Sequence, residues 1–193
     1  MALPLTLSVA TDPAWLTLAV ASFNEVLVDH AHCEKKAAAN ALSLLSAYPD
    51  IPTLPSNMAR LAREEASHLA QVLALMTKRG LALGRDHGDP YVQALHGQMR
   101  KGDHRMRLDK LLVAALVEAR SEERLALLAV GLPTEGLKQF YRRLAVSEAG
   151  HSTLFVRLAA KIAPREEVQE RLAELLAAEG EIVKRLPVRA AIH

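Results

Sequence analysis

The feature that most constrains this chain is a pair of polar residues, Glu148 and His151, set on an apolar helical stripe. They stand three residues apart, so on a helix both side chains project to the same side. That side is predicted to face the core, because apolar residues recur around Glu148 at helical spacing, at positions 141, 144, 145 and 155. The same pattern recurs at Glu65 and His68. A buried carboxylate is costly unless a positive group meets it, so both pairs call for a cation in the interior.

The whole chain is predicted to be all-α, in a single domain over residues 1–193, because apolar residues follow helical periods and no β-alternation is sustained. We expect four long bundle helices, a long crossover between the second and third, and an extra C-terminal helix packed outside. The predicted ranges are 13–47, 56–79, 108–129, 134–162 and 165–186. A break near residues 22–24, a short helix near residues 91–98 and a loose tail after Pro187 are also expected.

The first and third long helices each carry one glutamate centred on the apolar stripe, Glu34 and Glu118. Glu65 follows Glu34 by 31 residues and Glu148 follows Glu118 by 30, so the chain consists of two similar helical hairpins. One Glu and one Glu-x-x-His from each hairpin form the signature of ferritin-like di-iron or di-manganese proteins. Four carboxylates balance two divalent ions, and neutral imidazoles complete the shell. The alternative is a metal-free bundle with buried ion pairs.

Bulk composition excludes several classes of protein. The single cysteine, Cys33, permits no internal disulfide and no cysteine cluster for zinc or iron–sulfur, which suits the cytoplasm. We expect Cys33 to be a small core residue. The N-terminus lacks a basic region before its short apolar run, so no signal peptide is expected. No charge-free stretch of roughly 20 residues occurs, so no membrane span is expected.

Four strings around the predicted ligands resemble the MiaE-type tRNA hydroxylases, in that family's order. They are residues 28–38 (VDHAHCEKKAA), 63–68 (REEASH), 117–124 (VEARSEER) and 140–151 (FYRRLAVSEAGH). The resemblance covers about residues 15–160. One departure is the connection at residues 49–55, which is much shorter than in longer members of the family. It affects any RNA contact made there, but no ligand position.

The resemblance implies a di-iron monooxygenase that uses O2 to hydroxylate the isopentenyl side chain of 2-methylthio-N6-isopentenyladenosine, next to the anticodon of tRNA. It implies six iron ligands: Glu34, Glu65, His68, Glu118, Glu148 and His151. Electrons would come from an external reductase or ferredoxin system, since no segment is typical of a flavin or nicotinamide site. One alternative is a ferritin-like ferroxidase or peroxide-reducing protein without a tRNA substrate. Another is a non-enzymatic RNA-binding bundle whose acids are structural.

The crossover is predicted to contact tRNA, because eight basic residues oppose four acidic ones between residues 78 and 110. The ordinary alternative is a solvated loop. The candidate tRNA-binding residues are Lys78, Arg79, Arg85, Tyr91, Arg100, Lys101, Arg105 and Arg107, with Tyr91 offered for base stacking.

Four further residues are candidates for orienting the ligands from behind: His30, Asp109, Arg120 and Ser121. His30 lies one turn before Glu34, and the others match the family strings. The alternative for His30 is a satisfied core histidine, and the alternative for the other three is a polar network. The charged run at residues 165–174 is expected to be a solvated helix face. Gly150, between two ligands, is expected to allow a close helix approach or a local bulge.

Overall fold

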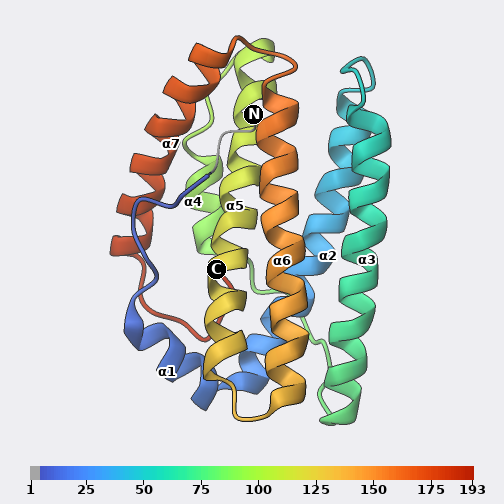
Figure 1. Cartoon of the computed structure of the whole chain (residues 1–193), viewed down its shortest axis with the longest axis vertical. Coiled ribbons are helices and arrows are strands. Elements are labelled where there is room, and N and C mark those ends of the chain that lie inside the picture. The colour runs from blue at the N-terminus through green and yellow to red at the C-terminus, as the bar shows by residue number, and fades with distance from the viewer. Residues whose placement is uncertain (1–4) are drawn as a thin grey trace. The chain divides into compact units, whose positions relative to one another are not determined.

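The computed structural model describes residues 5–193, which form seven α-helices and no β-strand (Figure 1). The helices are α1 (Pro13–Ala21), α2 (Phe23–Ala47), α3 (Leu54–Lys78), α4 (Pro90–His96), α5 (Asp103–Gly131), α6 (Glu135–Ala159) and α7 (Arg165–Arg185). The predicted helical class and the break near residue 22 are confirmed. No helix in the described range is both long and apolar enough to cross a membrane.

The chain divides into two compact units, each built around one helical hairpin. We call residues 18–88 and 190–192 the α2–α3 unit, and residues 5–17, 89–189 and 193 the α4–α7 unit. The division falls between the two hairpins that the repeated spacing predicts. The assignment of the whole chain to a single domain stays a prediction.

In the α2–α3 unit, the two helices lie side by side and are joined by the short connection at residues 48–53 (Figure 1). Their facing stripes are fully buried, as at Leu27, Ala31 and Met58. Gly80 ends α3 with a φ of 68°, in the left-handed region that glycine adopts without a steric penalty. The amide of Leu81 then donates to the carbonyl of Met76 at 3.0 Å, which closes the helix end.

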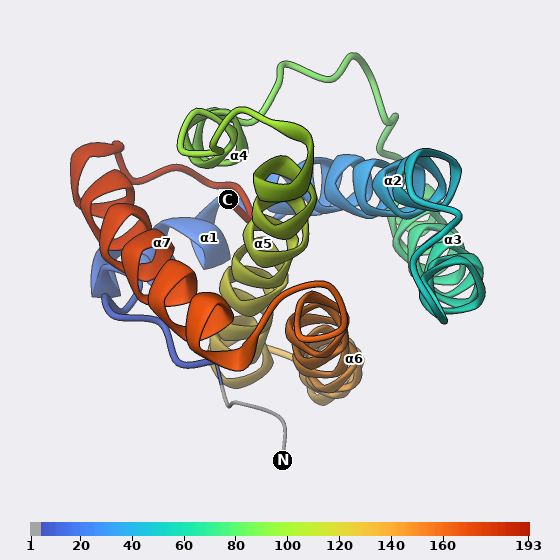
Figure 2. The same cartoon turned by 90° about the horizontal axis from the view of Figure 1, so that it is seen from above.

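In the α4–α7 unit, α5 and α6 form the second hairpin, and α7 packs on α5 and α4 (Figure 2). Thr134 caps α6 by accepting a hydrogen bond from the amide of Leu137, and Asp89 caps α4 in the same way through Val92. Helix α5 begins five residues earlier than predicted. Gly102, with a φ of 98°, precedes its first turn and accepts from the amide of Met106 at 2.8 Å.

The prediction of a loose tail is wrong. Ala191 and Ile192 are buried, and the amide of Ile192 donates to Oδ2 of Asp29 at 2.6 Å. His193 contacts Asp89 at 3.0 Å and the hydroxyl of Ser121 at 2.8 Å. All of these contacts join residues more than 70 positions apart, so no local sequence pattern in the tail predicts them.

Candidate metal centre

The α2–α3 unit buries three of the predicted ligands together: Glu34, Glu65 and His68. One ligand atom from each lies within 4.8 Å of the others. Nδ1 of His68 lies 3.5 Å from Oε2 of Glu34 and 3.5 Å from Oε2 of Glu65. Both carboxylates are at most 4% exposed. The i,i+3 spacing on α3 and the facing stripe of α2 therefore bring this set together as the sequence predicts.

The field of the two carboxylates acts strongly on His68. Burial alone lowers the pKa of this imidazole, but Glu34 and Glu65 outweigh that effect and raise the pKa to about 10. Two buried carboxylates thus favour a positive charge at this point of the unit. A proton on His68 can supply one charge, and a divalent cation supplies two.

The α4–α7 unit buries the matching set, Glu118, Glu148 and His151, again with ligand atoms within 4.8 Å of one another. All three are at most 6% exposed. Nδ1 of His151 lies 3.4 Å from Oε2 of Glu148, and its Nε2 lies 3.4 Å from the hydroxyl of Ser147. Each unit therefore holds two carboxylates and one imidazole.

This donor chemistry fits a metal ion. Carboxylate oxygen and imidazole nitrogen are ligands that suit Fe(II) and Mn(II). Oε2 of Glu34 is buried, lies 3.5 Å from Nδ1 of His68 and accepts no hydrogen bond from residues 5–193, as suits a metal ligand, whereas Oε1 is engaged by His30. The buried Glu and His clusters are consistent with a di-metal site.

His30 contributes the contact expected of a residue behind a ligand. Its Nε2 lies 2.7 Å from Oε1 of Glu34, and the ring is 1% exposed. A buried hydrogen bond of this length fixes the orientation of the Glu34 carboxylate.

A family model described as tRNA-(MS[2]IO[6]A)-hydroxylase (MiaE) matches residues 4–193. The chain belongs to the MiaE family. The predicted resemblance and the predicted enzyme class, an oxidoreductase that hydroxylates tRNA, are confirmed.

Two curated relatives carry the same description. The tRNA 2-(methylsulfanyl)-N(6)-isopentenyladenosine(37) hydroxylase of Pseudomonas putida is 38% identical over 174 residues, which cover 90% of this chain and 84% of that protein. The enzyme of the same name from Salmonella typhimurium is 32% identical over 130 residues, which cover 67% of this chain and 47% of that protein.

A solved structure also matches this MiaE-family chain. It is described as protein 43 with aldehyde deformylating oxygenase activity from Synechococcus. The match has a TM-score of 0.92 and 41% identity, and covers 97% of this chain and 94% of that one. The predicted ferritin-like fold class is confirmed by this likeness.

Three of the four residues predicted to orient ligands bind other groups. Asp109 is fully buried and accepts from the guanidinium of Arg100 at 2.8 Å and from that of Arg171 at 2.9 Å. Ser121 contacts His193. The hydrogen bonds given for Asp109 and Ser121 therefore lie within the α4–α7 unit and go to groups other than the predicted ligands.

Arg120 is the centre of a second buried network, as one of the two predicted roles for this residue has it, but the partners in the network were not predicted. Its guanidinium donates to Oε1 of Glu179 at 2.6 Å and to the carbonyl of Val9 at 2.8 Å. Tyr91 donates to the same Glu179 oxygen at 2.9 Å. The members of this network come from the N-terminal segment, α4, α5 and α7. The only sequence signal for them is that the helical members fall on the inward faces of their helices.

The expected solvated face at residues 165–174 holds only in part. Arg171 is 8% exposed, and its guanidinium binds Asp109 and the carbonyl of Gln98. Burial by itself lowers the pKa of Arg171, but its bonds to Asp109 and Glu174 prevail and raise it. The run contains two arginines, Arg165 and Arg171, and charge alone does not distinguish the buried one from the exposed one.

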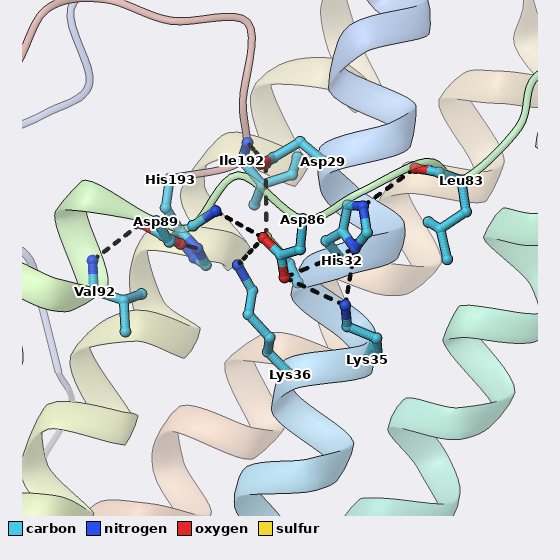
Figure 3. Close-up of polar contacts among 12 residues, drawn as sticks. Asp29, His32, Lys35, Lys36, Leu83, Asp86, Asp89, Val92, Ile192 and His193 are labelled. Atoms are coloured by element: carbon cyan, nitrogen blue, oxygen red, sulfur yellow. Dashed lines mark hydrogen bonds and ion pairs between the residues drawn. The ribbon is translucent and has the colours of Figure 1, made fainter.

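The basic crossover is not a free loop. Asp86 lies 3.3 Å from Nζ of Lys35 and 3.8 Å from both Nζ of Lys36 and Nδ1 of His32, all on α2 (Figure 3). The backbone amide of Gly88 and these cations hold the pKa of Asp86 below its ordinary value. The ring of His32 also contacts the carbonyl of Leu83 at 3.2 Å. The segment is thus tied to α2.

The candidate tRNA-binding residues differ in their exposure to solvent and in the ion pairs that they already make. Tyr91 is 2% exposed, stacks on His193 and binds Glu179, so its ring is not presented to solvent. Arg100 and Arg107 are held by Asp109 and Asp103. Five candidates have exposed side chains: Lys78, Arg79, Arg85, Lys101 and Arg105. Of these, Arg79 lies over the ring of Phe23 and donates to Asn24.

Gly150 matches neither explanation that its sequence context suggests. Helix α6 runs unbroken as α-helix from Glu135 to Ala159, which excludes a local bulge. A Cβ placed on Gly150 would meet nothing within 4 Å, so no close approach within the described chain requires the glycine.

Proposed function

We propose that this chain hydroxylates the isopentenyl side chain of 2-methylthio-N6-isopentenyladenosine next to the anticodon of tRNA, with O2 and two iron ions. The observation that supports this most is the repeated buried set of two carboxylates and one imidazole in a chain of the MiaE family. The six ligands would be Glu34, Glu65, His68, Glu118, Glu148 and His151. Their four carboxylates offset the charge of two ferrous ions.

Two bound ferrous ions would supply the activation of O2. One oxygen atom enters a C–H bond of the prenyl group and the other leaves as water, with two electrons and two protons taken up. The chain's own residues fix and shield the ligands. His30 holds the Glu34 carboxylate, Ser147 contacts the imidazole of His151, and burial of the donor atoms excludes water.

Contact with tRNA is proposed for the exposed members of the crossover, including Arg85, Lys101 and Arg105. Exposed Lys and Arg side chains neutralise phosphates and make binding depend on salt. A base already unpaired in the anticodon loop needs no extrusion from a duplex to reach the ligands.

The decisive experiment is nucleoside analysis of tRNA from cells with and without this gene. We expect the hydroxylated nucleoside only when the gene is present, and its unhydroxylated precursor when it is absent. Metal analysis of the protein after iron-replete expression should give about two iron ions per chain. An iron-free protein, or identical nucleosides in both strains, would overturn the proposal.

A second candidate function is favoured by the Synechococcus match, whose description names aldehyde deformylating oxygenase activity. The purified protein separates the two. A tRNA hydroxylase converts prenylated tRNA and leaves a long-chain aldehyde unchanged, whereas a deformylating enzyme releases formate from the aldehyde. A ferroxidase would instead oxidise iron at a rate indifferent to tRNA.

A further inference from the structure

The outer face of α6 combines charge, an apolar centre and exposed backbone. Its exposed side chains recur at helical spacing, so they lie on one side of the helix. We call this set the α6 outer face: Gln139, Arg142, Arg143, Val146, Ala149, Gly150, Thr153 and Arg157.

The α6 outer face is strongly basic. Between Glu135 and Glu166 the only acidic residue is Glu148, which is 3% exposed and belongs to the buried cluster. Glu135 lies 3.8 Å from Arg142, at the start of the helix. The rest of the face therefore presents arginines to solvent, and such a surface attracts an acidic partner and repels a basic one.

An apolar side chain stands in the middle of this charge. Val146 is 72% exposed, and it is one of four large apolar residues of residues 5–193 that are exposed. With Gln139, Arg142 and Arg143 it lines a shallow groove. A small apolar centre with a charged rim is the usual composition of a protein–protein interface, and small interfaces of this kind are common among transient electron-transfer pairs.

The neighbouring turn of α6 exposes backbone, because its outward residues have little or no side chain. Ala149 and Gly150 are exposed, and Gly150 has open space where a Cβ would lie. Glycine weakens a helix relative to almost any other residue, and no contact within the described chain explains it here. Close approach of a partner's surface to the backbone does explain it.

We propose that the α6 outer face docks an acidic one-electron carrier protein that reduces the metal centre. The inference rests on the proposed function, because each hydroxylation consumes two electrons that must come from outside the substrate. Two successive one-electron deliveries, with two protons, balance the loss of one oxygen atom of O2 as water. The carrier is oxidised by one electron at each visit.

The position of this face suits electron delivery. Glu148 and His151 project inward from the same turn of α6 that exposes Ala149 and Gly150. Since a helix with its side chains is about 10 Å across, a carrier on this face sits one helix thickness from two proposed ligands. RNA is the less suitable occupant, because recognition of unpaired bases uses exposed aromatic rings, and the α6 outer face has none.

The test uses iron-loaded protein, tRNA carrying the prenylated base, and a plant-type [2Fe–2S] ferredoxin with its reductase as the probe. In Arg142→Glu/Arg143→Glu, we expect the KM for ferredoxin to rise about tenfold or more and its salt dependence to weaken. Turnover driven by dithionite and affinity for tRNA should match the unaltered protein. The matched control, Lys184→Glu/Arg185→Glu, makes the same charge change on the exposed end of α7 and should leave all three readouts unchanged.

Direct binding of ferredoxin to the same proteins, measured by titration calorimetry at low salt, keeps this inference separate from the proposed function. If the unaltered protein fails to hydroxylate tRNA with dithionite, the proposed function fails while binding still reports on docking. Loss of ferredoxin binding in the α6 variant alone supports the inference. Unchanged binding, an equal decrease in the control, or weaker tRNA affinity instead would overturn it.

Gly150→Gln gives an independent check. Glutamine favours a helix more than glycine does, so this variant should raise the melting temperature. If a carrier approaches the bare backbone, the KM for ferredoxin should nevertheless rise several-fold. A stabilised protein with an unchanged KM for ferredoxin would contradict docking of the carrier at Gly150.

Discussion

Two regions of the α4–α7 unit bury acids in opposite ways. Asp109 and Glu179 are fully buried beside guanidinium groups, Arg171 for the first and Arg120 for the second. Glu148 is almost as deeply buried, but the side chain three residues along is an imidazole, which can lose its proton and bind a metal. The first pair of acids is neutralised by the chain's own fixed cations. The second arrangement suits an acid whose charge is offset by a metal ion.

Burial of a carboxylate therefore does not by itself indicate a functional site. The type of base beside it separates structure from chemistry, because arginine stays protonated under all physiological conditions, whereas histidine can lose its proton and bind a metal. Three experiments test this contrast between arginine-paired and histidine-paired acids, and a fourth tests the exposed cations of the crossover. They differ widely in the size of the effect that we expect.

The largest effect is expected from the ligand variants Glu118→Ala and His151→Ala. Each should abolish hydroxylation of tRNA, because a carboxylate or imidazole is removed from the metal shell. Far-UV circular dichroism should show the helix content largely retained. Nucleoside analysis and iron content provide the measurement. Retained activity in both variants would mean that the ligand set is wrong.

Arg120→Met should destabilise the protein by about 3–5 kcal/mol, because it leaves Glu179 buried without its guanidinium partner. Urea unfolding measures this decrease, and the double variant Arg120→Met/Glu179→Met should recover much of it. The control is Lys184→Met, which breaks the exposed pair with Glu181 and should cost less than about 1 kcal/mol. An effect on iron content in the folded Arg120 variant would contradict the separation of the two regions.

Asp109→Asn tests the same region through pH. Burial alone would raise the pKa of Asp109, but its bonds to Arg171 and Arg100 prevail and hold it below its ordinary value. The stabilisation is therefore present at neutral pH and disappears as the pH falls below about 4, through the folded-state pKa. The variant should be less stable by about 1–3 kcal/mol at pH 7 and by much less at pH 3. A difference that grows on acidification would refute the ion pairing.

The smallest effect is expected from Lys101→Ser and Arg105→Ser in the crossover. Each removes one exposed positive charge, so the slope of log affinity for tRNA against log salt should fall by about one for each phosphate that is no longer neutralised. Filter binding at several salt concentrations measures this slope. The control is Lys161→Ser, because Lys161 is also an exposed lysine. An equal change of the slope in this control would show only a general effect of charge.

Periodicity predicted most of the fold. The two hairpins, and the placing of the proposed ligands on their inner faces, follow from apolar residues spaced three and four apart. The early start of α5 was missed, because its first turn is polar and only Gly102 marks it.

What sequence reasoning could not supply are contacts between distant segments. Glu179 binds Arg120 across 59 residues and Tyr91 across 88, and either pairing is one of many that the helical faces allow. The burial of Tyr91 could not be predicted for this reason, since an aromatic ring in a basic segment is expected to be exposed until its partner is known. Local spacing constrains which way a side chain points, but not what meets it.

The segment at residues 80–89 lies between the two ligand sets in the sequence and contains no helix, and Arg85 within it is exposed. Backbone of this kind is where proteases cut most readily. A break after Arg85 leaves one complete Glu and Glu-x-x-His set on each of two polypeptides, 1–85 and 86–193. The two halves of the proposed donor set can therefore be made, labelled and varied on separate polypeptides.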